Sequence, residues 1–357
     1  MSEVSLHQIA VVVIGRNEGE GLRRCLGSID ERVAAIVYVD SGSTDGSVAL
    51  AESMGAQVVE LDAAVPFTAA RARNIGIAHV GRLASDVAFV QVVDGDCELI
   101  GTWLERALEV IVQHPKTAIV CGRRRERFPH TSMYNRLTDM EWDTPVGEAT
   151  ECGGDVLLRL EAFEEVSGYN ASLIAGEEPE LCLRLRQAGW TIRRIAAEMT
   201  LHDVRMTRFG QWWTRTVRSG YAFAESRALH GSSRERYCVH QVRSIIEWGA
   251  LLPLAAIALI WFTWGASLLL LAGYVMLWRR VRAHRIDHGD TPALAGFYAR
   301  YVVIGKLAQL VGCFRYWIGQ LIGRRASVIE YKNGAASSEM HNETKQPGLT
   351  APAGRPS

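Results

Sequence analysis

The sequence lacks a surplus of charge of either sign, since its 357 residues include 39 Lys and Arg against 39 Asp and Glu. Because nothing in the bulk charge attracts a polyanion, we expect no nucleic acid among its partners. We also expect no secretory leader. Residues 1–8 are polar, and the apolar run 9–14 is too short for the core of a signal peptide.

Paired cysteines are also missing. The seven cysteines form no Cys-x-x-Cys motif and no even framework of disulfide partners. We therefore expect reduced thiols, as in a cytosolic compartment. Charge itself is absent from one long stretch, 249–278, so hydrophobicity is uneven along the chain.

A strand that ends in two carboxylates organises the rest of the chain. Residues 89–93 are mostly apolar and β-branched at three positions, and Asp94, Gly95 and Asp96 follow them. Ligands of open α/β sheets bind at the carboxyl ends of strands. Two carboxylates there are hard oxygen ligands that suit Mg²⁺ or Mn²⁺, ions that usually also hold substrate phosphates. The alternative is an ordinary Asp-Gly turn.

Strands and helices alternate through the first third of the chain. Besides the strand at 89–93, we predict strands at 9–14, 35–40 and 57–61, and helices through Leu22 and Ile29 and at 47–54, 69–80 and 102–113. Alternation at this spacing predicts an α/β fold with a mostly parallel, Rossmann-like sheet flanked by helices.

Several motifs follow these elements in a fixed order. The first strand ends in Arg-Asn-Glu at 16–18, and the second runs into Val-Asp-Ser-Gly-Ser-Thr-Asp-Gly at 39–46. Ala-Arg-Asn-x-Gly at 72–76, the Asp-x-Asp, Gly-Tyr-Asn at 168–170 and an acidic helix start at 176–189 come next. Together, over residues 8–230, they resemble family 2 glycosyltransferases. The resemblance implies a GT-A fold and a nucleotide-diphosphate sugar donor, with UDP-sugars favoured.

The resemblance assigns donor-side roles to four residues. Arg16 and Glu18 would belong to the donor site, and Asp40 would accept a hydrogen bond from the nucleobase. Ser41 stands where the family usually has a second Asp, which loosens the choice of nucleobase, and Asp40 has an alternative role as a turn residue. Arg73 would face the diphosphate with Arg71 as a helper, unless both lie on a solvated helix face.

The metal site is implied in the same way. Asp96 would bind Mg²⁺ or Mn²⁺, while Asp94 would reach the ribose or the water shell of the metal. In some relatives a histidine completes the metal shell, and His202 occupies the matching region here. Its alternative is a structural histidine.

A general base would come from the acidic helix start, where Glu177, Glu178 and Glu180 compete. Aligning Gly176 and Arg184 with the family pattern puts Glu178 in the base position. We expect Pro179 to bias Glu178 toward an extended conformation. Glu180 would instead support Arg184, four residues on. The alternative role for all three carboxylates is stabilisation of the helix N-terminus.

The remaining segments of this part of the chain carry less specific patterns. The basic run at 123–127 is expected to be a solvated loop, and residues 151–155 would begin the acceptor side. We predict a helix at 157–165. Trp212 and Trp213 either belong to the core or contact a membrane surface.

The uncharged stretch 249–278 is too long for one upright membrane span, since as a helix it would measure about 45 Å against a hydrocarbon core of about 30 Å. Pro253 and the pair Trp264-Gly265 predict a bend, and arginines flank the stretch on both sides. We expect a membrane hairpin with both ends in the cytoplasm; the alternative is a buried helix of a soluble domain. The domains would be a catalytic domain at 1–238, the hairpin at 239–285, an interfacial amphipathic helix at 286–332 and a disordered tail at 333–357.

These expectations describe an inverting glycosyltransferase at the inner (plasma) membrane, with its catalytic domain in the cytoplasm. Its acceptor would be a lipid-linked molecule or a saccharide, in the synthesis of a cell-surface polysaccharide or glycolipid. A haloacid-dehalogenase-type phosphatase also uses Asp-x-Asp after a strand, but that strand is an early one and its motif continues differently from Cys97-Glu98. The remaining rival is a non-catalytic membrane protein that retains a nucleotide-sugar pocket.

Overall fold

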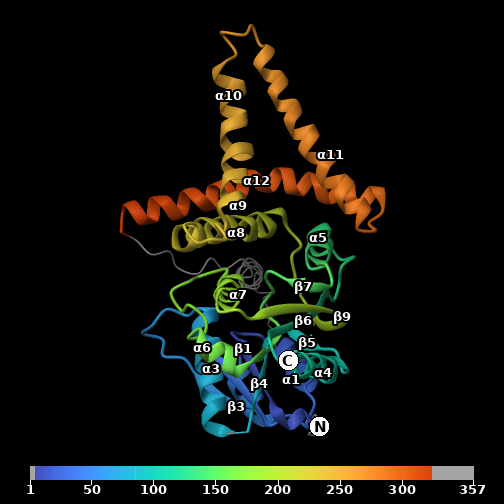
Figure 1. The fold of residues 1–357 in the computed structure, drawn as a ribbon, viewed down its shortest axis with the longest axis vertical. Helices are drawn as coiled ribbons and strands as arrows, with labels where there is room; N and C mark the ends of the chain where they lie inside the picture. The colour runs from blue at the N-terminus through green and yellow to red at the C-terminus, as the bar shows by residue number, and fades with distance from the viewer. Residues whose placement is uncertain (1–4, 85, 324–357) are drawn as a thin grey trace, which may run out of the picture.

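The computed structural model describes residues 5–84 and 86–323. Its first two hundred residues build one mixed sheet flanked by helices, and the remainder forms a helical layer with a projecting hairpin (Figure 1). In the described part of the chain the sheet has nine strands, in the order β3-β2-β1-β4-β8-β6-β9-β5, with β7 paired to β9.

The N-terminal half of the sheet is parallel, as predicted. Strand β1 (Ile9–Gly15) lies between β2 (Ala35–Asp40) and β4 (Phe89–Asp94), and β3 (Gln57–Glu60) extends the sheet beyond β2. Residues 9–14 are buried without interruption, because helices cover the sheet and no face is left for water. The helices that connect or follow these strands are α1 (Glu20–Gly27), α2 (Ser47–Ser53), α3 (Ala69–Leu83) and α4 (Trp103–Gln113).

The other half of the sheet is mostly antiparallel. Strand β8 (Val156–Arg159) runs antiparallel to both β4 and β6 (Thr117–Glu126), while β9 (Thr191–His202) runs parallel to β6. Two short strands, β5 (Cys97–Leu99) and β7 (Gly147–Ala149), pair antiparallel with β9. The register of β5 places Cys97 opposite His202, and so brings the end of the Asp-x-Asp turn to the end of β9.

The prediction of a helix at 157–165 is wrong over its first three residues. Val156, Leu157 and Leu158 belong to β8 and are buried between two strands, and only α6 (Leu160–Glu165) is helical. A short apolar run does not distinguish a buried strand from a helix, and here pairing with β4 and β6 decides the outcome.

Two long helices cross above the sheet. They are α8 (Phe209–His230) and α12 (Pro292–Leu321), and glycines let their main chains touch: a Cβ on Gly220 would lie 2.5 Å from Gln309 Cα, and one on Gly312 would lie 2.6 Å from the Tyr221 nitrogen. The remaining helices of the first two hundred residues are η1 (Leu6–Gln8), α5 (Met133–Glu141) and α7 (Glu177–Gln187).

A helical hairpin projects from this layer (Figure 1). One arm contains α9 (Val239–Ile246), a π-helical turn η2 (Glu247–Leu251) and α10 (Leu252–Ala258); the other contains η3 (Ala266–Leu271) and α11 (Ala272–Asp287). The predicted break is present, because Trp264 and Gly265 both have positive φ in the turn between the arms. In the residues that the structure describes, no helix combines the length and apolar character needed to cross a membrane. The tail predicted at 333–357 lies outside the described residues.

Candidate active site

Asp96 and His202 meet at the carboxyl end of β4, as the paired β5 and β9 require. Asp96 Oδ2 lies 2.9 Å from His202 Nε2, and both side chains are more than nine-tenths buried. Two ligands bound at right angles to one ion, each at about 2.1 Å, would lie about 3.0 Å apart. A carboxylate oxygen and an imidazole nitrogen also suit Mn²⁺ or Mg²⁺ as donors. The two predicted ligands therefore fit a divalent cation.

Cys97 is the third group near this point, since its Sγ lies 3.6 Å from Asp96 Oδ1. Burial raises the pKa of the Cys97 thiol well above its ordinary value, and the neighbouring carboxylate of Asp155 raises it further. The sulfur therefore stays protonated and makes a poor ligand for a hard cation.

Asp94 is held by two arginines. Its Oδ1 lies 2.9 Å from an Arg73 nitrogen and its Oδ2 lies 3.4 Å from an Arg124 nitrogen. Burial alone would raise the pKa of Asp94, but the guanidinium groups of Arg73 and Arg124 outweigh it and hold the pKa below its ordinary value. Asp94 is therefore a fixed carboxylate at the edge of the metal site.

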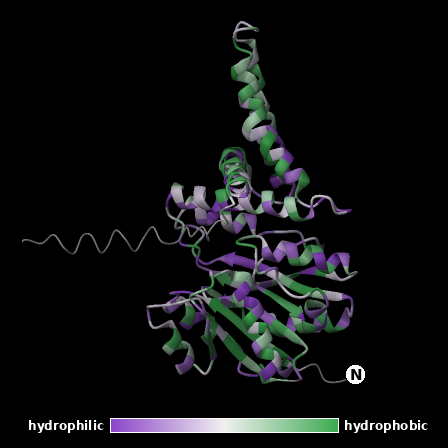
Figure 2. Cartoon of the chain, turned by 90° about the vertical axis from the view of Figure 1, so that its left-hand side faces the viewer, coloured by the Kyte–Doolittle hydropathy of each residue, from purple (hydrophilic) through white to green (hydrophobic). Residues whose placement is uncertain are grey.

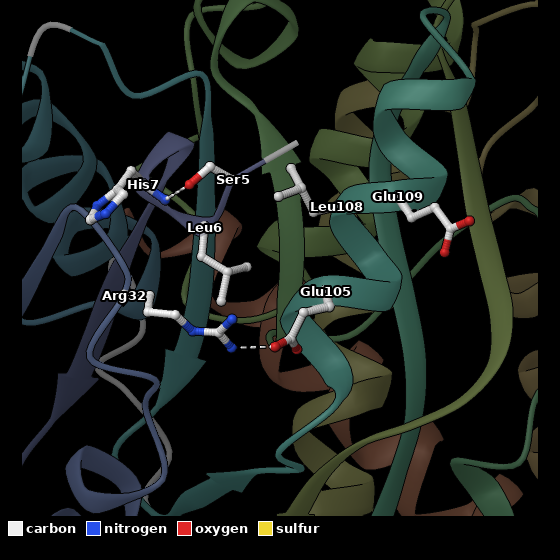
Figure 3. Close-up of a pocket in the computed structure, with 7 residues that line it drawn as sticks. All are labelled: Ser5, Leu6, His7, Arg32, Glu105, Leu108 and Glu109. Atoms are coloured by element: carbon white, nitrogen blue, oxygen red, sulfur yellow. Dashed lines mark hydrogen bonds and ion pairs between the residues drawn. The ribbon is translucent and has the colours of Figure 1, made fainter. Parts of the chain in front are cut away.

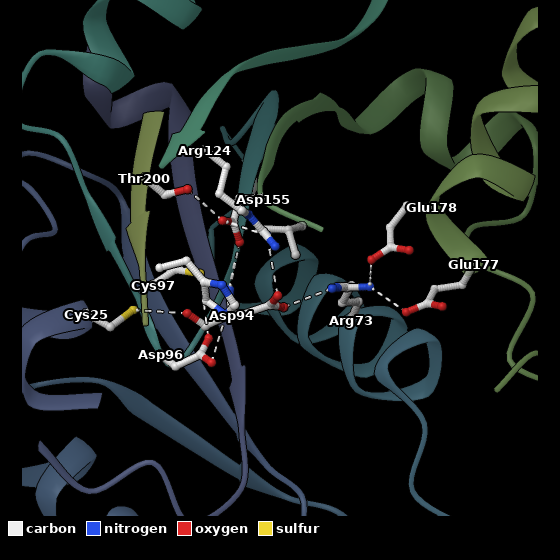
Figure 4. Close-up of polar contacts among 12 residues, drawn as sticks. Cys25, Arg73, Asp94, Asp96, Cys97, Arg124, Asp155, Glu177, Glu178 and Thr200 are labelled. Atoms are coloured by element: carbon white, nitrogen blue, oxygen red, sulfur yellow. Dashed lines mark hydrogen bonds and ion pairs between the residues drawn. The ribbon is translucent and has the colours of Figure 1, made fainter. Parts of the chain in front are cut away.

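Arg124 and Asp155 are site residues that the sequence did not reveal. Arg124 lies on β6, within the basic run expected to be a solvated loop, and it forms a 2.7 Å ion pair with the buried Asp155. Asp155 also accepts hydrogen bonds from the Thr200 hydroxyl at 2.7 Å and from the Asp94 amide at 3.1 Å (Figure 4). The expectation of a solvated loop was wrong, because β6 continues through these arginines beside β9. The apolar run 117–121, which precedes these arginines, was the sequence signal that could have predicted the strand.

An aromatic ring covers this cluster. Trp142 lies at the end of α5 with its ring centroid 5.0 Å from that of His202, and the Arg124 guanidinium carbon lies 5.3 Å from the Trp142 centroid. The indole shields the Asp96–His202 pair from one side. A shielded pair interacts more strongly than an exposed one, because water does not screen it fully.

The second acidic centre lies across Arg73 from Asp94 (Figure 4). Arg73 Nη1 is 2.9 Å from Glu177 Oε1 and 2.8 Å from Glu178 Oε1, and the arginine side chain is only 2% exposed. The Glu178 side chain is 17% exposed and that of Glu177 is 5% exposed. Burial raises the pKa of Glu177, and the charge of Glu178 raises it further. Glu178 is the carboxylate of the pair that a substrate can reach.

The conformation expected of Glu178 was wrong. Helix α7 already begins at Glu177, after Gly176 with a φ of 80°, so Glu178 is helical and not extended. Pro179 is the third residue of the helix, where its missing N–H breaks no hydrogen bond, and the first turn therefore tolerates it. The expected support of Arg184 by Glu180 is confirmed, with an ion pair at 2.8 Å.

The residues assigned to nucleotide recognition lie at the ends of β1 and β2. Asp40 is buried, and it accepts hydrogen bonds from the Tyr38 hydroxyl at 3.0 Å and from the amides of Gly42 and Ser43 at 2.8 and 2.7 Å. These contacts match the turn role that the sequence left open beside nucleobase recognition. Nucleobase binding by Asp40 stays a prediction.

Arg16 and Glu18 lie on the loop after β1. The Arg16 guanidinium lies 5.7 Å from the centroid of Phe67. The Glu18 side chain packs against the Asp-x-Asp turn, since a Cβ on Gly95 would lie 3.3 Å from Glu18 Cγ. Arg71 points elsewhere: it donates hydrogen bonds to the carbonyls of Asp62 and Val65, so it holds a loop and is not placed as a helper of Arg73.

A separate pocket lies between the N-terminal segment and α4. Its lining includes Leu6, Leu108 and an Arg32–Glu105 ion pair (Figure 3). It contains neither acidic centre, so it is not the site described above.

Comparison with known proteins agrees with the order of these motifs. Residues 10–164 match the model of the family described as glycosyl transferase family 2. The comparisons support assignment to glycosyltransferase family 2. The Asp-x-Asp turn falls inside the matched segment, whereas the α7 carboxylates and His202 lie beyond it.

Relatives and one solved structure are similar to a longer part of the chain. Glycosyltransferase AglE of Haloferax volcanii is 23% identical over 225 residues, which cover 59% of this chain and 71% of that protein. The pre-mycofactocin glycosyltransferase of Mycobacterium tuberculosis is 26% identical over 241 residues, or 63% of this chain and 49% of that protein. The structure of the mannosyltransferase PcManGT from Pyrobaculum calidifontis, in complex with GDP-Man and Mn²⁺, aligns over 87% of both chains with a TM-score of 0.59 and 16% identity.

The sequence matches and the structural match support different conclusions. The chain spans only about half the length of the mycobacterial relative, so the sequence matches support a family and leave the substrate open. At 16% identity the PcManGT likeness shows a shared fold alone, a GT-A-like α/β sheet flanked by helices. It extends over 87% of this chain, well beyond the segment that matches the family model.

Proposed function

We propose that this chain is a metal-dependent inverting glycosyltransferase that moves a sugar from a nucleotide-diphosphate sugar to an acceptor hydroxyl. The observation that carries the proposal is the pairing of two acidic centres across one buried arginine. Asp94 and Asp96 form one centre at the end of β4, and Glu177 and Glu178 form the other at the start of α7. A donor bound at the first centre would present its anomeric carbon toward the second.

In this mechanism Glu178 is the general base. Arg73 binds its Oε1 and leaves Oε2 to accept the proton of the acceptor hydroxyl. The acceptor oxygen then forms a bond to the anomeric carbon, while the bond from that carbon to the phosphate oxygen breaks on the opposite face. The nucleoside diphosphate leaves with the bonding electrons, and the configuration inverts. A cation held by Asp96 and His202 would offset the charge on the departing diphosphate.

A donor panel tests this function. Purified protein is incubated with Mn²⁺, a lipid extract as the source of acceptors and each of a set of UDP- and GDP-sugars, and release of nucleoside diphosphate is measured. We expect one class of donor to be turned over, with UDP-sugars favoured, and chelation of the metal to stop turnover. No release or transfer from any donor would favour the rival, a non-catalytic protein with a retained nucleotide-sugar pocket.

We also propose that the chain works on the cytoplasmic face of the inner membrane, with a lipid-linked acceptor of a cell-surface polysaccharide or glycolipid. The hairpin supports this location, because Trp261, Phe262 and Trp264 at its tip are 89%, 84% and 98% exposed to solvent. Soluble proteins rarely expose apolar side chains side by side in this way. Figure 2 shows apolar residues along the arms and hydrophilic ones toward the base of α11.

The dimensions and polar groups of the hairpin suit insertion from one side. From its turn to Arg279 on α11 the second arm rises about 24 Å, less than the hydrocarbon thickness of about 30 Å. The hydroxyls of Thr263 and Ser267 donate to main-chain carbonyls within the hairpin, at 2.8 and 2.7 Å, as lipid surroundings require. Arginines at 279, 280 and 282 follow the apolar part, at the level expected for lipid headgroups.

Vesicle flotation tests the membrane proposal. The full chain should float with vesicles that contain phosphatidylglycerol, and a variant with Ser at 261, 262 and 264 should lose most of that binding. Phe128→Ser removes an exposed phenylalanine from the end of β6 and should leave binding unchanged. If the triple variant floats as well as the unmodified chain, the hairpin is not the anchor.

A further inference from the structure

Arg73 lies between the two acidic centres, and both of its Nη atoms are paired there, whereas its buried Nε has no hydrogen-bond partner among the described residues. Its guanidinium binds Asp94 on one side and Glu177 and Glu178 on the other, so one cation serves three carboxylates. Each of the two Nη atoms makes at least one short contact, at 2.8–2.9 Å. The arginine is almost wholly buried, 5.6 Å from the centroid of the Tyr169 ring.

The main chain at Gly154 also lies close to this guanidinium. A Cβ on Gly154 would overlap Arg73 Nη2 and would lie 2.9 Å from Glu178 Oε1. The missing side chain at Gly154 therefore leaves the room that the guanidinium and the Glu178 carboxylate occupy. For its Nη atoms to bind a phosphate, Arg73 would have to leave these carboxylates and strip them of their cation in a buried place, which is unfavourable. Its Nε, which is not paired, is shielded from solvent.

We propose that Arg73 is a positioning residue, which orients the Glu178 carboxylate and ties it to Asp94, and that it is not a ligand of the donor diphosphate. This inference rests on the proposed function, because it takes Glu178 as the base. It replaces the role that the family resemblance implied for Arg73. It also links the donor and acceptor centres through one side chain.

The proposal has a consequence for the charges around Glu178. The groups that face Glu178 are Arg73 from α3, Glu177 from its own helix, Tyr169, and Cys152 from the segment before β8, while Arg218 of α8 faces Glu177. Burial and the charge of Glu178 raise the pKa of Glu177, and the charge of Arg73 opposes them. Without Arg73, no cation would lie between the two adjacent carboxylates, and their repulsion would turn the Glu178 carboxylate away from its place.

The test compares Arg73→Met and Arg73→Lys with Arg82→Met, an exposed arginine at the end of the same helix. With UDP-glucose or GDP-mannose as donor, whichever the unmodified chain turns over, kcat for Arg73→Met should fall about 10²-fold, the usual loss when a reacting group is misplaced by about 1 Å. Calorimetric binding of UDP and GDP with Mn²⁺ should change less than about threefold. Arg73→Lys keeps the charge and should restore part of kcat, and it carries the test if Arg73→Met does not fold.

A double variant separates positioning from other roles. If Arg73 acts through Glu178, Arg73→Lys should lower kcat in the native background but not further in Glu178→Gln. Additive losses, or loss of nucleotide binding with kcat preserved, would overturn the proposal and restore the diphosphate role. If Glu178→Gln itself keeps full turnover, the choice of base is wrong, whereas inert unmodified protein would mean that the proposed function has failed.

Discussion

Replacing Gly154 with alanine should damage catalysis far more than it damages folding. The added Cβ would overlap an Arg73 nitrogen, and it would lie 3.3 Å from Arg73 Cζ and 2.9 Å from Glu178 Oε1. Carbon normally keeps about 3.5–4.0 Å from such atoms, so the guanidinium must move by roughly 1 Å and the carboxylate by roughly 0.5 Å. Because Arg73 is buried, it has no solvent to move into.

The size of the effect follows from these displacements. Overpacking of this kind costs about 1–3 kcal/mol of stability, which a domain of this size tolerates, whereas a reacting group misplaced by about 1 Å costs about 10²-fold in rate. Gly153→Ala is the matched control, since its Cβ would meet no atom within 4 Å. The test measures the steady-state kcat and the melting temperature of both variants. Equal kcat for the two variants would refute the packing argument, and so would a Gly154→Ala protein with native turnover.

Two further substitutions test the metal site and the helical layer. Asp96→Asn should abolish turnover that depends on Mn²⁺ or Mg²⁺ while leaving the melting temperature of the metal-free protein nearly unchanged; native activity of the unmodified chain in excess chelator would reject Asp96 as a ligand. Gly220→Ala should destabilise the packing of α8 on α12 by about 1–3 kcal/mol, because its Cβ would meet the main chain of Gln309. Gly210→Ala, at the start of α8 with open space around its Cβ, should melt like the unmodified chain.

The local sequence pattern was enough to predict the strands in the first half of the sheet. The runs that form β1, β2 and β4 are short, apolar and bounded by turn residues, and each strand begins within a residue of the predicted position. The pairing of Asp96 with His202 was anticipated only through the family resemblance. The residues lie 106 positions apart, and no local signal joins them before β5 pairs with β9.

The missed features depend on tertiary contacts. Arg124 looks like part of a charged loop until β6 extends beside β9 and places it against Asp155. The short apolar run at Val156–Arg159 fits either a strand or the start of a helix. Its pairing with β4 and β6 decides its conformation. The family resemblance implied a diphosphate role for Arg73, and the sequence does not show that Glu177 and Glu178 reach it from 104 and 105 residues away.

The most direct test of the central claim is turnover of Glu178→Gln beside Glu177→Gln. The substitution at 178 removes proton acceptance and little shape, so kcat should fall by about 10²–10⁴-fold, the usual contribution of a general base. Binding of the nucleotide sugar should survive, and Glu180→Gln should cost far less. Near-normal transfer by Glu178→Gln together with an inactive Glu177→Gln would identify Glu177 as the base, and native turnover by both would contradict the account of this site.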